Sequence, residues 1–263
     1  RTYVQQLKQR CDEKDRKVDA IVADILENVR NNGDKAVAEY TLKFDGSIPE
    51  QVEITKEQMK ELTKQCDAYF LEALERAAKN IHEFHSRQKQ QSWLDTKDNG
   101  VILGQRVRGL AKVGIYVPGG TAAYPSSVLM NAIPAKIAGV QEIVMVTPPG
   151  KDGKPNPDIM AAALVAGVDR VFLVGGAQAV AALAYGTETM PKVDKIVGPG
   201  NIFVATAKKH LYGTVDIDMI AGPSEILIVA DETANPKYLA ADLMSQAEHD
   251  VLASAILLTT SSK

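Results

Sequence analysis

Two hydrophobic patterns divide the chain near residue 100. Before that point, apolar residues recur at the three- and four-residue spacing of a helix face, first at Val18, Ile21, Val22, Ile25, Leu26 and Val29. This helix is expected to end at Asn32-Gly33. A longer helix is predicted from about Lys56 to His85, with an apolar stripe of Met59, Leu62, Cys66, Phe70, Leu74 and Ala77. The charged faces of these helices are typical of solvated surfaces, and no chemistry is expected there.

Beyond residue 100, short β-branched runs alternate with alanine-rich stretches. The runs predict strands at Val113–Val117, Glu142–Thr147, Arg170–Val174, Lys195–Val197, Glu225–Ala230 and Ala255–Thr259. Helices are predicted between them, at about Ser126–Ala138, Pro157–Ala166, Ala177–Tyr185, Asn201–Leu211 and Pro236–Glu248. Apolar strands joined by crossover helices indicate an α/β fold: a Rossmann-like, mainly parallel sheet with helices on both faces, preceded by a helical N-terminal region.

Composition narrows the classes of function. A net charge of −3 and a pI near 5.9 give no basic footprint for nucleic acid. Two cysteines without metal-type spacing favour a reducing, cytoplasmic location. No apolar run reaches the ~20 residues of a membrane span, and the first residues do not resemble a signal peptide. Because the sequence starts without Met and stops just after a strand-like run, we expect it to be part of a longer protein.

Three glycine-rich turns follow predicted strands and lead into helices. They are Val117-Pro118-Gly119-Gly120, Val174-Gly175-Gly176-Ala177-Gln178 and Val197-Gly198-Pro199-Gly200-Asn201. Ligands of open parallel sheets bind beyond the carboxyl ends of the strands, where helix N-termini attract anions. The turns therefore predict a cleft for a phosphate-bearing cofactor. The full dinucleotide fingerprint and the P-loop are both absent, and such turns also occur in α/β proteins that bind no nucleotide.

A candidate metal motif closes the last predicted helix. Gln246 and His249 lie three residues apart and so share a helix face, and imidazole and carbonyl groups both bind zinc. Spacing alone favours the simpler interpretation, in which His249 complements the helix dipole. His82 and His85 have the same spacing but lie in the charged region, and we interpret them as surface residues. Ser224, in the turn before a strand, is by itself only a turn residue.

Several of these motifs occur in an order that resembles a known family. They are Val113–Gly120, Tyr124–Met130, Gly175–Ala179, Gly198–Asn201, Ala221–Glu225 and Ser245–Asp250. The series resembles histidinol dehydrogenase, densely from about residue 104 to 250. The resemblance implies an NAD- and zinc-dependent oxidation of L-histidinol to L-histidine through L-histidinaldehyde, by an intertwined homodimer with an architecture similar to aldehyde dehydrogenase.

The resemblance also assigns roles to single residues. Tyr116, Gln178 and Asn201 match residues that contact NAD, Ser224 matches a substrate-contacting serine, and Gln246 and His249 match two ligands of a Zn²⁺ ion that anchors the substrate. The family's catalytic Glu-His pair and its remaining zinc ligands would lie beyond residue 263. We therefore expect this stretch to bind zinc weakly and to be inactive alone. The implied domains are a helical region 1–103, a Rossmann-like domain 104–232 and the start of a second at 233–263.

Two alternatives belong to other classes. An aldehyde or acyl-phosphate reductase of similar architecture would use a cysteine thiolate, but Cys11 and Cys66 both lie in the charged helical half. A non-enzymatic binding module would take up ligands without turnover.

Overall fold

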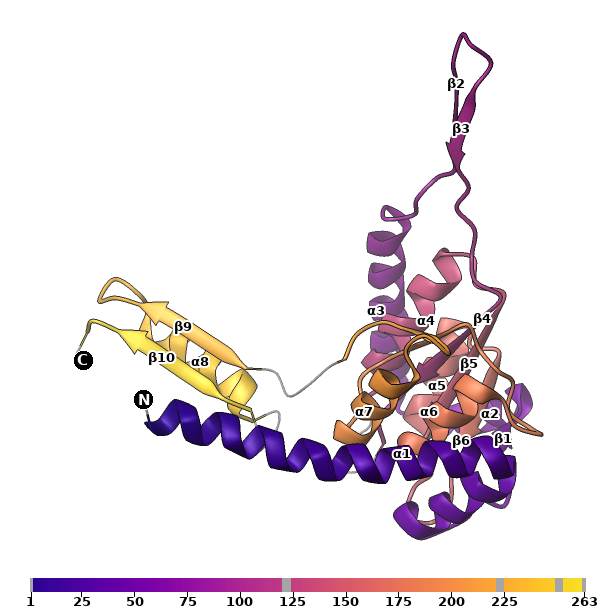
Figure 1. Ribbon diagram of the computed structural model, residues 1–263, viewed down its shortest axis with the longest axis horizontal. Helices are drawn as coiled ribbons and strands as arrows, with labels where there is room; N and C mark the ends of the chain where they lie inside the picture. The colour runs from indigo at the N-terminus through magenta and orange to yellow at the C-terminus, as the bar shows by residue number, and fades with distance from the viewer. Residues whose placement is uncertain (1, 120–123, 221–224, 249–252, 262–263) are drawn as a thin grey trace. The chain divides into compact units, whose positions relative to one another are not determined.

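The computed structural model describes residues 2–119, 124–220, 225–248 and 253–261 (Figure 1). It divides into two compact units, Arg1–Ile220 and Ala221–Lys263.

The larger unit is built on a six-stranded sheet. Its strands lie in the order β1 (Glu53–Ile54), β6 (Arg170–Leu173), β5 (Glu142–Thr147), β4 (Lys112–Tyr116), β7 (Lys195–Val197) and β8 (Asp216–Ile217). All neighbouring pairs are parallel except β1 with β6. The mainly parallel α/β fold predicted from the sequence is thus confirmed. The two edge strands were missed because two residues are too short to show a pattern.

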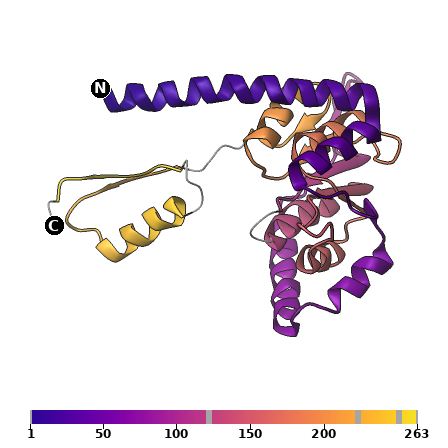
Figure 2. The ribbon, with the colours of Figure 1, turned by 90° about the horizontal axis from the view of Figure 1, so that it is seen from below.

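Helices cover both faces of this sheet because strand side chains alternate between its two sides. One face carries Tyr116, Val144 and Phe172, which pack against α1 (Thr2–Asp45), α6 (Gly176–Tyr185) and α7 (Ile202–Leu211). The other face carries Ile115, Met145 and Leu173, which pack against α2 (Lys56–Thr63), α3 (Ala68–Ser86), α4 (Pro125–Ile137) and α5 (Pro157–Ala166). Figure 2 shows the two helical layers on either side of the strands. The helices of the first hundred residues therefore share both cores with the sheet.

Local sequence sets the helix ends. At α5, the Asn156 side chain accepts hydrogen bonds from the N–H groups of Asp158 and Ile159, Pro157 takes the first helical position, and Gly167 ends the helix at φ 74°. These are the preferred residues at each of the three positions. Such signals explain why most helix bounds predicted from the sequence agree with the structure to within a residue.

The N-terminal helices confirm the prediction in one place and differ from it in another. Gly33, where a helix end was predicted, has non-helical angles (φ 50°, ψ −132°), so α1 consists of two helices that meet in a kink at this residue. The single helix expected over 56–85 is two helices, because Asp67 caps α3 by accepting from the N–H groups of Tyr69 and Phe70. A short cap within a periodic stretch is easily overlooked, because the apolar stripe continues across it.

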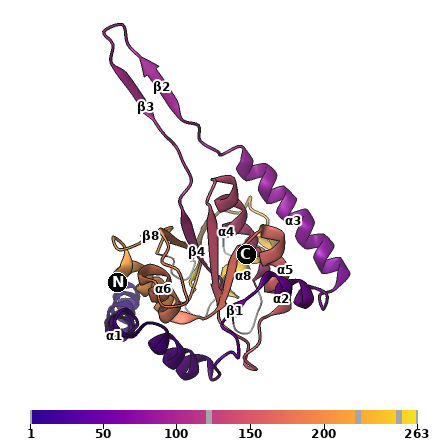
Figure 3. The same ribbon diagram turned by 90° about the vertical axis from the view of Figure 1, so that its right-hand side faces the viewer.

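A β-hairpin was also missed. Strands β2 (Trp93–Thr96) and β3 (Ile102–Gln105) pair antiparallel, and every residue in them is exposed. Figure 3 shows the hairpin standing away from the sheet. Because the hairpin has no buried face, its sequence need not alternate between polar and apolar residues, and the hydrophobic pattern does not reveal the two strands.

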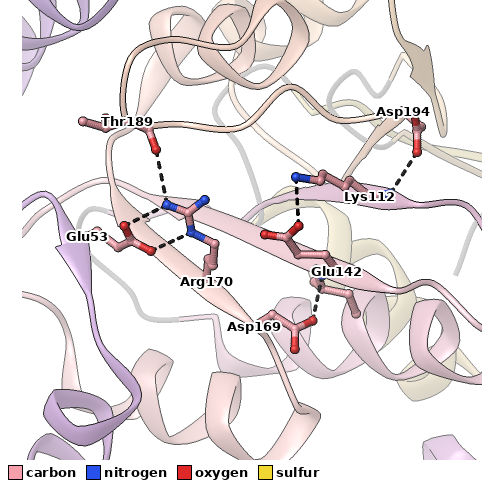
Figure 4. Close-up of polar contacts among 8 residues, drawn as sticks. Glu53, Lys112, Glu142, Asp169, Arg170, Thr189 and Asp194 are labelled. Carbon is pink, nitrogen blue, oxygen red and sulfur yellow. Dashed lines mark hydrogen bonds and ion pairs between the residues drawn. The ribbon is translucent and has the colours of Figure 1, made fainter.

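Ion pairs and charged hydrogen bonds close the amino edge of the sheet (Figure 4). Arg170, at the start of β6, binds both carboxylate oxygens of Glu53 at 2.7 and 2.9 Å. Lys112, at the start of β4, pairs with Glu142 at 3.0 Å, and its N–H donates to Asp194 at 2.8 Å. The Arg170 contact lowers the pKa of Glu53, since the guanidinium favours the carboxylate. Side chains from different strands thus bind one another along this edge.

The smaller unit is a parallel pair with one crossover helix. Strand β9 (Ile226–Ala230) pairs with β10 (Ala255–Thr259), and α8 (Pro236–Ala247) connects them and packs on both. Leu227, Val229 and Leu258 remain exposed. Parallel sheets in α/β proteins are normally covered on both faces. This pattern suits the beginning of a larger α/β domain.

The domain boundaries expected at 103/104 and 232/233 stay predictions, whereas compactness divides the chain between residues 220 and 221. No helix in the described ranges is both long enough and apolar enough to cross a membrane.

Candidate functional site at the carboxyl edge of the sheet

The strand order places a topological switch point beside β4. From β4 the chain proceeds through β5 to β6 on one side, and then returns to place β7 on the other side of β4. The connections leaving β4 and β7 therefore diverge at the carboxyl edge, and such a switch point is where open α/β sheets bind ligands. Tyr116 ends β4 and Gly198 follows β7, so two of the three predicted turns flank this point.

The glycines of the three turns are needed because other backbone or ring atoms lie against them. A Cβ at Gly198, which has φ +108°, would lie 2.2 Å from the carbonyl oxygen of Tyr116. A Cβ at Gly119 or at Gly175 would lie 2.5 or 2.6 Å from the ring of Pro148, which follows β5. The turns thus converge on Tyr116 and Pro148. Packing between the turns therefore requires glycine at these positions.

Tyr116 connects two of these turns. Its side chain is buried, and its hydroxyl accepts a hydrogen bond of 3.0 Å from the N–H of Gly176. Burial raises the pKa of Tyr116 to about 12, and the nearby Asp45 carboxylate adds to the rise. The phenol therefore stays neutral at physiological pH and keeps its proton available for a hydrogen bond to a ligand.

Gln178 is the most unusual residue of the site. It lies in the first turn of α6 and is only 1% exposed, yet neither its Nε2 nor its Oε1 has a hydrogen-bond partner among the described residues. A Cβ at Gly176 would lie 2.5 Å from this Oε1, so the amide rests against the glycine turn. A buried amide without partners is costly, and such groups need an explanation. A ligand that supplies both an acceptor and a donor would satisfy it.

Asn201 already has a structural role, because its side chain caps a helix. It is the N-cap of α7, where its Oδ1 accepts from the N–H groups of Phe203 and Val204 at 3.0 and 3.2 Å. Its oxygen is therefore occupied, and only its amide NH₂ is free to donate to a ligand. The cofactor roles expected for Tyr116, Gln178 and Asn201 remain predictions, and the structure brings Tyr116 and Gln178 to the same turn, at Gly176.

Asp45 was missed by the sequence analysis. It ends α1, and burial without a compensating cation raises the pKa of its carboxyl. Its Oδ2 is buried and has no hydrogen-bond partner in the described part of the chain. It lies near enough to Tyr116 to raise the pKa of that phenol. No local pattern could have revealed it, because it is brought to the sheet edge by a helix that starts more than a hundred residues before β4 ends.

Only part of the candidate metal motif lies within the described residues. Ser224 and His249 lie outside the described residues. Gln246 lies in the last turn of α8 and is half-buried, and its side-chain amide makes no hydrogen bond within the described part of the chain. Gln246 is thus free to offer its carbonyl oxygen to a cation. No group of three His, Cys, Asp or Glu side chains suited to a metal occurs in the described ranges. His82 is exposed, whereas His85 is half-buried.

The fold and this edge define an α/β protein with a mainly parallel sheet, whose switch point is flanked by closely packed glycine turns. Comparison with known proteins gives the family. The histidinol dehydrogenase family model matches residues 8–263. The chain is 62% identical over 259 residues to histidinol dehydrogenase of Clostridium acetobutylicum, and 54% identical over 259 residues to that of Bacillus anthracis, covering 98% of this chain in both cases. This chain belongs to the histidinol dehydrogenase family.

A solved structure supports the same assignment. The crystal structure of histidinol dehydrogenase from Elizabethkingia anophelis superposes with a TM-score of 0.85 at 41% identity, and the match covers 92% of this chain and 56% of that one. The chain also covers 60% of the length of the Clostridium and Bacillus relatives. It therefore spans little more than half of a family member.

Proposed function

We propose that the protein to which this chain belongs is a histidinol dehydrogenase, which oxidises L-histidinol to L-histidine through L-histidinaldehyde with NAD and a Zn²⁺ ion. The observation that carries the proposal is Gln178, a buried amide without partners where the glycine turns converge. Family membership supplies the reaction. We further propose that the protein works as a cytoplasmic homodimer and binds neither nucleic acid nor membrane, in keeping with its charge and composition.

This chain would supply the cofactor side of the site. NAD, when bound, supplies the hydride acceptor. The neutral Tyr116 phenol and the Gln178 amide would hydrogen-bond the cofactor, the Asn201 NH₂ would donate to it, and the bare backbone at Gly175 and Gly198 would admit it closely. Burial at this edge would exclude water from these polar contacts and so strengthen them.

The substrate side would be shared with the rest of the protein. Gln246 and His249 would be two of the zinc ligands, and Ser224 would contact the substrate; zinc, when bound, anchors and orients the alcohol. Two ligands are only half of a tetrahedral shell. The acid–base residues are expected outside these 263 residues, so the chain alone should not turn over substrate.

Cys66 weakens the cysteine-dependent alternative. Burial, and then the Asp158 carboxylate, raise the pKa of its thiol to about 11, and it packs on the face of the sheet that carries α2 to α5. A thiol with a raised pKa is a poor nucleophile at neutral pH.

The test is NADH formation from L-histidinol by the full-length protein, measured with and without a chelator. Gln178→Met should raise the KM for NAD roughly tenfold, the usual effect of losing a buried hydrogen-bond partner. Gln141→Met is the matched control, since Gln141 is exposed before β5. Gln246→Leu should lower the zinc content measured by atomic absorption. Turnover that withstands chelation would contradict the zinc role, and an unchanged KM in Gln178→Met would contradict the cofactor role.

A further inference from the structure

A buried lysine lies beneath the third glycine turn. Lys208, on α7, is 2% exposed, and its Nζ donates to the carbonyl oxygen of Gly198 at 3.0 Å and pairs with the carboxylate of Asp218. Lysine is almost never fully buried unless it is paired. Both partners of this ammonium group in the described ranges, the Gly198 carbonyl and the Asp218 carboxylate, therefore lie beside the third glycine turn.

Asp218 binds the same glycine from its other side. Its Oδ2 accepts from the N–H of Gly198 at 2.8 Å, and its Oδ1 accepts from the N–H of Met219 at 2.6 Å. Both backbone polar groups of Gly198 are thus bound by the two members of one ion pair. With φ +108° and the Tyr116 carbonyl against it, this position admits only glycine. Glycine is also the residue with the most freedom to leave a required conformation.

A contribution to folding stability does not by itself explain why this ion pair is buried. Buried ion pairs lose much of their attraction to desolvation, and apolar replacements often stabilise a protein equally well. The neighbouring strand offers a contrast: Lys195 and Asp216 pair at 2.7 Å with side chains 31% and 53% exposed, and the Nζ of Lys195 has no other hydrogen-bond partner in the described ranges. Only the Lys208–Asp218 pair, 3% and 28% exposed, holds a glycine turn at the switch point.

We propose that Lys208 and Asp218 are positioning residues that fix the Gly198–Asn201 turn in the conformation that binds the dinucleotide. This inference rests on the proposed function. The pair removes in advance the conformational entropy that the turn would otherwise lose when the cofactor binds.

The test compares two ion pairs in the full-length protein. Lys208→Met removes the buried ammonium, and Lys195→Met removes the exposed one as the matched control. The dissociation constant for NADH is measured by fluorescence titration, the KM for L-histidinol by turnover, and hydrogen exchange at residues 198–201 by mass spectrometry. Lys208→Met should weaken NADH binding roughly tenfold and speed exchange at the turn, with the KM for L-histidinol changed far less. Lys195→Met should leave all three unchanged.

A second variant covers the case in which Lys208→Met does not fold. Asp218→Asn keeps the shape of the side chain and the acceptor for the Gly198 N–H, and it should weaken NADH binding in the same direction by a smaller factor. Wild-type NADH affinity and unchanged exchange in either folded variant would overturn the inference, as would equal losses in the Lys195 control. If the wild type binds no NADH, the proposed function fails instead, and exchange at 198–201 alone decides whether the pair positions the turn.

Discussion

Replacing Gln178 with Met should stabilise the chain while it damages the proposed cofactor site. The native side chain is 1% exposed and leaves both amide atoms without partners in α6. An unsatisfied buried polar group costs about 1–3 kcal/mol. Methionine has almost the same length and about the same helix propensity as glutamine. A volume-conserving change costs less than about 1.5 kcal/mol in repacking, which leaves a net gain of about 1 kcal/mol.

Urea unfolding of the 263-residue chain, followed by far-UV circular dichroism, measures this gain. With a slope of about 1–3 kcal/mol per molar urea, the midpoint should rise by roughly 0.3–1 M. Gln141→Met, at an exposed position, should change stability by no more than about 0.5 kcal/mol. A lower midpoint for Gln178→Met would refute the reasoning, because it would mean that the buried amide is already satisfied in the free protein.

Four further outcomes are expected. Gly213→Ala should cost about 1–3 kcal/mol for its positive φ (+98°) alone, since no atom lies within 4 Å of the new Cβ. Gly198→Ala should cost about 1–3 kcal/mol more because it also meets the Tyr116 carbonyl, and equal costs in urea unfolding would contradict the close approach. Asp45→Asn should raise the melting temperature at pH 7. The pKa of Asp45 is raised because the folded state disfavours its charged form. The gain in melting temperature should therefore fade as the pH falls through the raised pKa toward the ordinary value of 3.8. A gain that does not depend on pH would exclude this cause. In a Cys11→Ser background, Cys66 should be alkylated far more slowly in the native chain than in urea at pH 8, since its pKa is about 11; equal rates would show that the thiol is not protected.

The elements of the larger unit could be read from the sequence because their causes are local. Strand β5 is a continuous apolar run, and α5 is bounded by Asn156-Pro157 and Gly167. The three glycine turns were found for the same reason, since each lies directly between a strand and a helix. The elements that were missed have no local cause of this kind: β1 and β8 are two residues long, and the hairpin β2–β3 has no buried face.

What only the tertiary structure decided is how the site is assembled from distant segments. The sequence named Tyr116 and Gln178, but the hydrogen bond from Gly176 to the Tyr116 hydroxyl spans 60 residues, and the orphaned amide of Gln178 depends on everything packed around it. Asp45 reaches the same edge from α1, and Lys208 and Asp218 meet at Gly198 from a helix and the end of an edge strand. Periodicity reports which face of an element is buried, whereas such contacts depend on strand order. That order is set by the packing of the whole chain.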